Sequence, residues 1–372
     1  MFEDAFKVSV VDEGLFKEGE KLLRDYVKYE MPGLTYTGGR TSYAVRRYTF
    51  KGASAKLIRG YLNKKTEDEL SIAMHMPVGK DCSVERSDEG GLAVIVPRLD
   101  KTTLSLGDGL RLMQDIPKNT EKMLAYIGEC ADGQPAIMEF SMSTPHWMIA
   151  GKAGSGKTSC LLSMLFSLMG RYTPDELNIY VADHKNLPSF EGIAHIKRRA
   201  VSDGEVAGMF QELVEVMKTR IKMLGEMNIV DHNLMYPDKK MPHILVVFDE
   251  VDQVIARGSG VVNDTIRQLV KYIAAEGRSS GIHLVLASQK PVGANVDTTI
   301  SSNISGRIAL QAANAHDSRT IIGDKGAEKL TGSGDAYMQT SVNAHKRIQC
   351  AYVSYPESQQ AKKWLMEHYP AK

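Results

Sequence analysis

The sequence predicts a mixed α/β fold, in which a parallel sheet with helices on both faces follows a small α+β domain. From about residue 141 onward, short apolar runs alternate with amphipathic helical stretches, which is the pattern of parallel strand-helix-strand units. Before residue 140, the chain instead carries a helix, a basic stretch and strands joined by turns. We therefore expect a helical segment over 1–30, a small α+β domain over 31–140 and a larger domain over 141–372.

Composition indicates an ordinary globular protein. The chain has 372 residues, of which 43% are hydrophobic and 24% are charged, and its net charge is +1. A net charge this small does not by itself indicate nucleic-acid binding, so any basic binding site must be local. The four cysteines lie far apart without a C-x-x-C spacing, and no apolar run approaches the ~20 residues that span a bilayer. We expect a reduced, cytoplasmic protein.

The first 140 residues combine a helix, a basic segment and short strands. An amphipathic helix is expected over Leu15–Tyr29, and strands over Ser71–Met76 and Leu92–Pro97. Gly128–Phe140 is typical of a hairpin. The segment 31–66 has eight basic residues, no acidic ones and interleaved tyrosines. This is either a nucleic-acid face or a solvated surface, and we slightly favour the second.

The next element is a short apolar strand, His146–Ala150, followed by a glycine-rich loop and an apolar helical stretch, Ser159–Met169. The loop fits G-x-x-x-x-G-K-[ST], a phosphate-binding loop in the strand–loop–helix context that it requires. Glycines let several backbone N–H groups face phosphate oxygens, and the helix adds its positive end. The expected ATP-binding residues are Gly151, Lys152, Ala153, Gly154, Ser155, Gly156, Lys157, Thr158 and Ser159.

The alternation continues toward the C-terminus. Strands are expected at Asn178–Asp183, Ile282–Ala287 and Arg307–Gln311. Helices are expected at Glu205–Met227, where Ser202 and Glu205 form a capping box, and at Asp264–Glu276.

A second acidic motif completes the predicted nucleotide site. His243–Phe248 is a near-continuous apolar strand, followed by Asp249 and Glu250. Such a strand carries Asp249 to the edge of the sheet, where it can hold Mg²⁺ together with the Thr158 hydroxyl. Glu250 is then placed to deprotonate the attacking water, so the pair indicates hydrolysis.

Two further residues flank the strand Ile282–Ala287. Gln289 follows it and is expected to contact the γ-phosphate. Arg278 precedes the strand and therefore lies at its other end, out of reach of the same nucleotide. It is either a surface arginine or an arginine finger for a neighbouring subunit.

At this point the sequence resembles the FtsK/SpoIIIE family of ring-shaped DNA translocases, which have a RecA-like P-loop fold. Five blocks carry the resemblance over about 140–355: Pro145–Thr158, Val181–Lys185 with Phe190–His195, Phe248–Glu250, Gly277–Pro291 and Asn303–Asp335. Residues from about 31 to 140 resemble the family's β subdomain.

The resemblance implies a hexameric ring that threads double-stranded DNA, with ATP and Mg²⁺ as cofactors. It implies that Lys157, Asp249, Glu250 and Gln289 are catalytic, and that Arg278 acts in trans. It also suggests a pore-facing loop over Lys290–Ser302. The DNA-contact candidates are Lys185, Lys197, Arg198, Arg199, Thr298, Thr299, Ser301 and Ser302.

Three alternatives stay open at the sequence level. They are a conjugative coupling ATPase for single-stranded DNA, a type VII-like protein-secretion ATPase, and a non-enzymatic ring or scaffold. The intact Lys157, Asp249 and Glu250 argue against the last. We recognise no membrane-spanning N-terminus and no C-terminal winged helix of the family, so we expect no reading of DNA orientation sequences.

Overall fold

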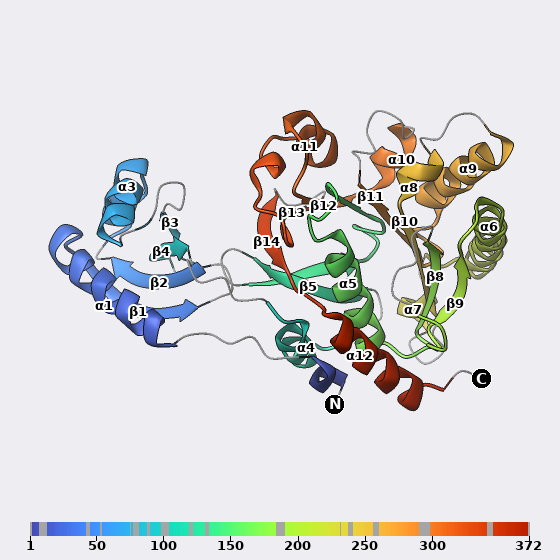
Figure 1. Cartoon of the computed structure of the whole chain (residues 1–372), viewed down its shortest axis with the longest axis horizontal. Coiled ribbons are helices and arrows are strands. Elements are labelled where there is room, and N and C mark those ends of the chain that lie inside the picture. Colours follow the sequence, from blue (N-terminus) through green and yellow to red (C-terminus); the bar gives the residue numbers. More distant parts are fainter. Residues whose placement is uncertain are drawn as a thin grey trace. The chain divides into compact units, whose positions relative to one another are not determined.

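The chain forms two compact units, which are described separately (Figure 1). The computed structural model describes residues 2–6, 13–41, 45–52, 54–74, 76, 82–87, 90–97, 104–118, 122–130, 134–183, 190–230, 232–236, 241–255, 260–289, 298–340 and 345–370. The smaller unit comprises Ser9–Leu104 and Glu129–Pro135. The larger comprises Met1–Val8, Ser105–Gly128 and Ala136–Lys372.

The smaller unit is a four-stranded antiparallel sheet with three helices. Its strands lie in the order β1–β2–β4–β3. Side chains of α1, β2 and β4, among them Leu23, Phe50 and Val94, form a common hydrophobic core. The element bounds are α1 Glu13–Glu30, β1 Leu34–Thr41, β2 Val45–Gly52, α2 Ala55–Tyr61, α3 Lys64–Ala73, β3 Ser83–Arg86 and β4 Leu92–Pro97.

Two expectations for this unit change in the structure. Ser71–Ala73 end helix α3 rather than begin a strand, because Asn63 caps the helix and Lys64 pairs with Asp68 one turn on. Two tyrosines of the basic stretch pack inside the unit, since Tyr48 is fully buried and Tyr36 packs edge-on against Phe50. This favours the solvated-surface interpretation.

The larger unit is built on a ten-stranded sheet of order β6–β5–β14–β13–β12–β7–β11–β10–β8–β9. The strands from β12 to β9 are parallel, whereas β13 pairs antiparallel with both of its neighbours, β12 and β14. The strand bounds are β5 Met123–Cys130, β6 Pro135–Phe140, β7 Trp147–Ala150, β8 Leu177–Asp183, β9 Ile196–Ala200, β10 His243–Asp249, β11 Ile282–Ser288, β12 Gly306–Leu310, β13 Asp335–Gln339 and β14 Lys346–Cys350.

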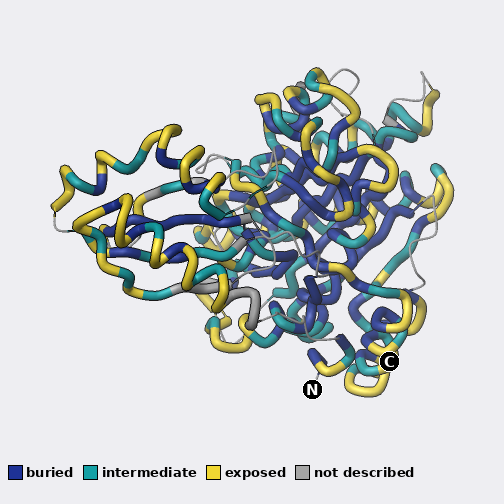
Figure 2. The backbone as a smooth tube through the Cα atoms, turned by 60° about the vertical axis from the view of Figure 1, so that its left-hand side comes forward, coloured by how far each residue is buried: buried dark blue, intermediate teal, exposed yellow. Residues whose placement is uncertain are grey.

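Helices cover both faces of this sheet. Successive residues of a strand point to opposite faces, and β10 is buried from Ile244 to Asp249 without alternation. Figure 2 shows buried backbone segments gathered in the interior of the larger unit. The fold class predicted from the sequence is therefore confirmed, as is the capping box at Ser202. The helix bounds are η1 Phe2–Ala5, α4 Leu106–Gln114, α5 Lys157–Arg171, α6 Asp203–Met227, α7 His232–Met235, α8 Val251–Ile255, α9 Val261–Glu276, α10 Thr298–Asn303, α11 Ala315–Ile322, η2 Ala327–Lys329 and α12 Tyr355–His368.

The compact units divide the chain differently from the predicted boundaries at residues 30 and 140. Strands β5 and β6 extend the large sheet beside β14, and the Ala351 N–H bonds the Ile127 carbonyl at 2.8 Å. The backbones approach so closely that a Cβ on Gly128 would lie 1.9 Å from the Gln349 carbonyl oxygen. An antiparallel hairpin can extend either sheet, so its sequence pattern does not assign it to one unit.

Candidate active site

The glycine-rich loop Gly151–Gly156 connects β7 to α5, as the motif predicts. Gly154 and Gly156 have φ angles of 76° and 105°, a backbone conformation that side chains disfavour. Backbone hydrogen bonds fix the loop's start, where the Gly151 N–H reaches the Ser288 carbonyl at 3.2 Å and the Lys152 N–H reaches that of Gln311 at 2.9 Å. The loop is thus held by the ends of β11 and β12.

A cavity of about 260 Å³ opens above this loop. Gln289 lines it together with the predicted ATP-binding residues except Gly151 and Ser155, which are buried. Lys157 is buried at the cavity wall and Thr158 is exposed at the start of α5. The structure therefore brings the loop, the helix N-terminus and Gln289 around one space.

A second loop supports the glycine-rich loop from the other side. The Gly334 N–H donates to the Ser155 carbonyl at 2.8 Å, and a Cβ on Gly156 would lie only 2.4 Å from the Gly334 nitrogen. Asp335 holds this second loop through a 2.7 Å ion pair with Arg347. The sequence reading gave this segment no role, although its closely spaced glycines at 332 and 334 were a signal of close backbone approach.

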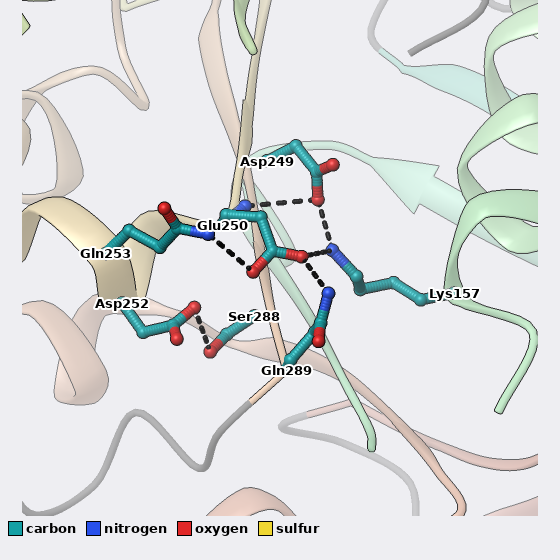
Figure 3. A network of polar contacts seen from close by, with 7 residues as sticks. All are labelled: Lys157, Asp249, Glu250, Asp252, Gln253, Ser288 and Gln289. Atoms are coloured by element: carbon teal, nitrogen blue, oxygen red, sulfur yellow. Dashed lines mark hydrogen bonds and ion pairs between the residues drawn. The ribbon is translucent and has the colours of Figure 1, made fainter. Parts of the chain in front are cut away.

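The ends of β10 and β11 place a charged cluster beside Lys157 (Figure 3). The Lys157 ammonium pairs with Asp249 and, at 3.0 Å, with Glu250 Oε1. Gln289 donates to the same Glu250 oxygen. All three charged side chains are nearly excluded from solvent. The structure thus brings together four of the five predicted catalytic residues.

Glu250 is held from a strained backbone position. Its φ is +57°, which is uncommon for a residue with a side chain. Gln253, on α8, donates to Glu250 Oε2 at 3.4 Å, and the neighbouring Ser288 hydroxyl donates to Asp252 Oδ1 at 2.8 Å. Sequence reasoning missed Gln253, Asp252 and Ser288. The only signal was their position within three residues of Glu250 or next to Gln289.

Burial dominates the electrostatics of the cluster. It raises the pKa of Asp249, against the lowering effect of Lys157, and the nearby Glu250 and Asp183 raise it further. Asp183 ends β8 and is paired in register with Asp249. Two carboxylates and one lysine leave a net negative charge that a divalent cation would neutralise.

The residues present fit both predicted cofactors. Backbone N–H groups at a helix N-terminus and Lys157 suit a triphosphate. The Thr158 hydroxyl and the Asp249 carboxylate are the hard oxygen ligands that Mg²⁺ prefers, and Mg²⁺ usually takes only one or two protein ligands beside phosphates. Accordingly, no group of three or more His, Cys, Asp or Glu residues suited to a metal occurs among the described residues.

Arg278 lies away from this cluster, as its place before the strand predicts. It belongs to the turn between α9 and β11, at the amino edge of the parallel strands, whereas Gln289 follows the carboxyl end of β11. Its side chain is exposed and has no hydrogen bond or ion pair with any described residue. Within one chain it does not complete the nucleotide site.

The described candidate DNA contacts differ in the partners that they already have. Arg198 and Arg199, on the edge strand β9, are engaged in ion pairs with Glu212 at 2.8 Å and Asp183 at 2.9 Å. Lys197 is exposed and donates to the Ala194 carbonyl. Lys185 lies outside the described residues.

The predicted pore-facing loop also changes. Lys290 to 297 lie outside the described residues, and Thr298–Asn303 form helix α10 rather than loop. Thr298 and Thr299 begin this helix, Ser302 is exposed on it, and the Ser301 hydroxyl accepts a hydrogen bond from Arg307. The helical pattern was too short to recognise in the sequence.

The fold and this cluster define a P-loop ATPase. Comparison with known proteins gives the family: the FtsK/SpoIIIE family profile matches residues 113–320. The chain is 32% identical over 301 residues to the DNA translocase FtsK of Sporosarcina ureae. This match covers 76% of this chain and 38% of the relative. It is 29% identical over 309 residues to the DNA translocase SpoIIIE of Bacillus subtilis, covering 78% of this chain and 38% of the relative. The chain belongs to the FtsK/SpoIIIE family, and spans less than half the length of these relatives.

Solved structures agree on the fold. The pCW3 conjugation coupling protein TcpA, in its monomer form with ATPγS, superposes with a TM-score of 0.57 at 16% identity, covering 93% of this chain and 99% of that protein. The cytoplasmic domain of the type VII secretion ATPase EccC from Thermomonospora curvata gives a TM-score of 0.60 at 25% identity, covering 68% of this chain and 32% of that protein. Among the described residues, no helix is long and apolar enough to cross a membrane.

Proposed function

We propose that the protein is an ATP-driven translocase of double-stranded DNA that works as a hexameric ring in the cytoplasm, with ATP hydrolysed at subunit interfaces. One observation carries this proposal. The Lys157–Asp249–Glu250–Gln289 cluster is assembled at the carboxyl edge of the sheet, whereas Arg278 is exposed at the amino edge. A second subunit would complete a site that is split in this way.

The chain's own residues divide the work. Lys157 and the backbone N–H groups of Gly154–Thr158 would bind the triphosphate, and Thr158 and Asp249 would hold Mg²⁺. When bound, Mg²⁺ would neutralise charge on the β- and γ-phosphates. Because Lys157 is paired with Glu250 at 3.0 Å, binding the γ-phosphate would draw the ammonium away and free the carboxylate. Glu250 would then accept the proton of the attacking water while Gln289 contacts the γ-phosphate.

The neighbouring subunit would supply the last charge. Arg278 of that subunit would stabilise the negative charge that develops on the transferred phosphoryl group. We further propose that the smaller unit corresponds to the family's β subdomain and that residues Lys290–Ser302 face the DNA. The DNA-translocating activity named for the FtsK and SpoIIIE relatives supports this substrate.

The test is ATP hydrolysis without nucleic acid, with double-stranded DNA and with single-stranded DNA, each at low and moderate salt. Phosphate contacts release counterions, so stimulation by duplex DNA should be strong and should fall steeply with salt. A preference for single strands would instead indicate a coupling protein. Indifference to both nucleic acids would reject the proposal and point to a protein substrate.

A further inference from the structure

The turn that carries Arg278 is rigidly closed on itself. The Ser280 and Ile282 N–H groups both donate to the Gly277 carbonyl at 3.1 Å, and the Ser280 hydroxyl donates to it at 2.8 Å. A Cβ on Gly277 would lie 2.6 Å from the Ile273 carbonyl oxygen, so a side chain does not fit there. The turn therefore presents Arg278 from a fixed backbone.

Arg220 ties this turn to the rest of the larger unit. It lies on α6, and its Nη1 donates to the Ser280 carbonyl at 2.8 Å while its Nη2 donates to the Pro242 carbonyl at 2.9 Å. One guanidinium thus bridges the turn and the segment that leads into β10. The planar fork of arginine makes both bonds at once, which a lysine ammonium does with less geometric constraint.

The charge of Arg220 has an unusual environment. The described residues offer it no carboxylate, and its acceptors are neutral carbonyls. Burial lowers the pKa of Arg220 to about 10, with Tyr180 opposing the shift. Arg220 is partly buried, and a cation shielded from water without an acid costs stability, so its presence calls for a role that a neutral side chain does not fulfil.

Other contacts hold the same segment. Asn233 exchanges two hydrogen bonds with Met241, at 2.9 and 2.7 Å, next to the Pro242 carbonyl that Arg220 uses. The Ile244 N–H donates to the Gly281 carbonyl at 2.9 Å. Arg220, Arg278 and Asn233 line one small cavity of about 30 Å³, which has room for about one water molecule.

We propose that Arg220 is a positioning residue for Arg278, which fixes the finger's turn so that its guanidinium meets the nucleotide of the next subunit. This inference rests on the proposed function in which Arg278 acts in trans. A misplacement of about 1 Å in a charge-stabilising group can reduce the rate about 100-fold. Arg220 does not line the cavity at the glycine-rich loop of its own subunit, so its loss would act on turnover and not on ATP binding.

The primary test compares Arg220→Met with Arg278→Ala. We expect Arg220→Met to reduce kcat at least about 10-fold, while ATP affinity stays within about twofold of the wild type. Arg220→Lys keeps the charge but not the planar fork, so its kcat should lie between those of the wild type and Arg220→Met. If Arg278→Ala is inactive but Arg220→Met retains wild-type kcat, the inference is wrong. If Arg278→Ala is itself active, the trans mechanism fails instead.

Mixed rings separate positioning from folding. Glu250→Ala subunits still supply a native finger, so mixing them with Arg220→Met subunits should restore part of the activity. Mixing Arg220→Met with Arg278→Ala should restore none, because both lack a working finger. Rescue by both partners, or by neither, would overturn the assignment.

The chain offers a matched control. Arg171 also bonds backbone carbonyls, those of Met113 and Ile116, but at the end of α5 away from the finger turn. Arg171→Met should lower stability without changing kcat per folded subunit. If Arg220→Met does not fold, Arg220→Lys decides the question, and a kcat within twofold of the wild type would refute the proposal.

Discussion

The carboxyl and amino edges of the large sheet give their cationic side chains different partners. At the carboxyl edge, Lys157 is neutralised by two carboxylates, Asp249 and Glu250. At the amino edge, the acceptors of Arg220 among the described residues are backbone carbonyls, and Arg220 lines a small cavity together with histidines such as His243 and His283. The first edge can exchange partners when a phosphate arrives. The second is a rigid frame, from which Arg278 projects into solvent.

The histidines of the amino edge belong to this frame. His243 and His283 are 3.2 Å apart at their ring nitrogens, and His283 Nδ1 lies 3.0 Å from the Pro145 carbonyl oxygen. His146 Nδ1 accepts the Leu284 N–H at 2.9 Å. Burial lowers the pKa of His146 to about 4 and that of His283 well below its usual value. His146 and His283 are therefore neutral structural links rather than acid–base groups.

The largest effect on turnover is expected from a substitution at the amino edge. Arg278→Ala should reduce kcat about 1,000-fold, equivalent to about 4 kcal/mol, because a trans-acting arginine stabilises the transition state only. ATP affinity should be unchanged, since the cavity of the same subunit does not include Arg278. Steady-state turnover and nucleotide binding by calorimetry measure both. A parallel loss of ATP binding would place Arg278 in the site of its own subunit.

At the carboxyl edge, Glu250→Gln should reduce kcat about 100-fold, because the amide keeps the shape of the side chain but does not accept the proton of water. ATP binding should persist or tighten, since Lys157 is no longer shared with a second carboxylate. Glu212→Gln, which removes an acid that pairs with Arg198 on the edge strand, is the control. Turnover of Glu250→Gln at the control's level would exclude Glu250 as the general base.

The two edges also differ in how far the sequence predicts them. The carboxyl edge could be predicted residue by residue, because phosphate binding demands glycines and a lysine at fixed spacing and because an apolar strand carries its last acid to the edge. The contacts supplied by Gln253, by the Ser288–Asp252 pair and by Gly334 were not predicted. They come from segments that meet the site through tertiary packing.

The amino edge was predicted only in part. Arg278 could be placed at the far end of β11 from strand direction alone. Arg220 was invisible, because one arginine within an amphipathic helix reads as a solvated residue, and only the structure shows its two carbonyl partners. The same limit applies to β9, where only the structure shows that Arg198 pairs with Glu212 and Arg199 with Asp183.

His146 gives the next smaller effect, on stability. Its folded pKa of about 4 lies below the unfolded value near 6.5, so the unfolded chain binds more protons and stability falls as the pH drops. The loss of stability from His146 is absent above pH 7 and reaches about 2 kcal/mol at pH 5. In denaturant unfolding at several pH values, His146→Asn should lose less stability than the wild type over this range. Parallel curves would show that His146 is not the titrating group.

The smallest effect is expected from loss of the N-terminal cap of α6, the helix that carries Arg220. Ser202 caps this helix, and the Glu205 carboxylate accepts the Ser202 and Val201 N–H groups at 3.0 and 2.9 Å. Ser202→Ala should lower the free energy of unfolding by about 1 kcal/mol. Turnover should stay within twofold, because about five helical turns separate the cap from Arg220 and fraying is confined to the first turn.

Ser354→Ala removes the matching capping box of α12, a helix that packs against η1 and α5, and is the control for a general loss of stability. Equal losses of stability with wild-type turnover in both variants would confirm that the frame is local to Arg220. If Ser202→Ala alone slowed turnover while Ser354→Ala did not, the whole of α6 would act as the support of the finger. The positioning role would then extend along the helix rather than rest on one guanidinium.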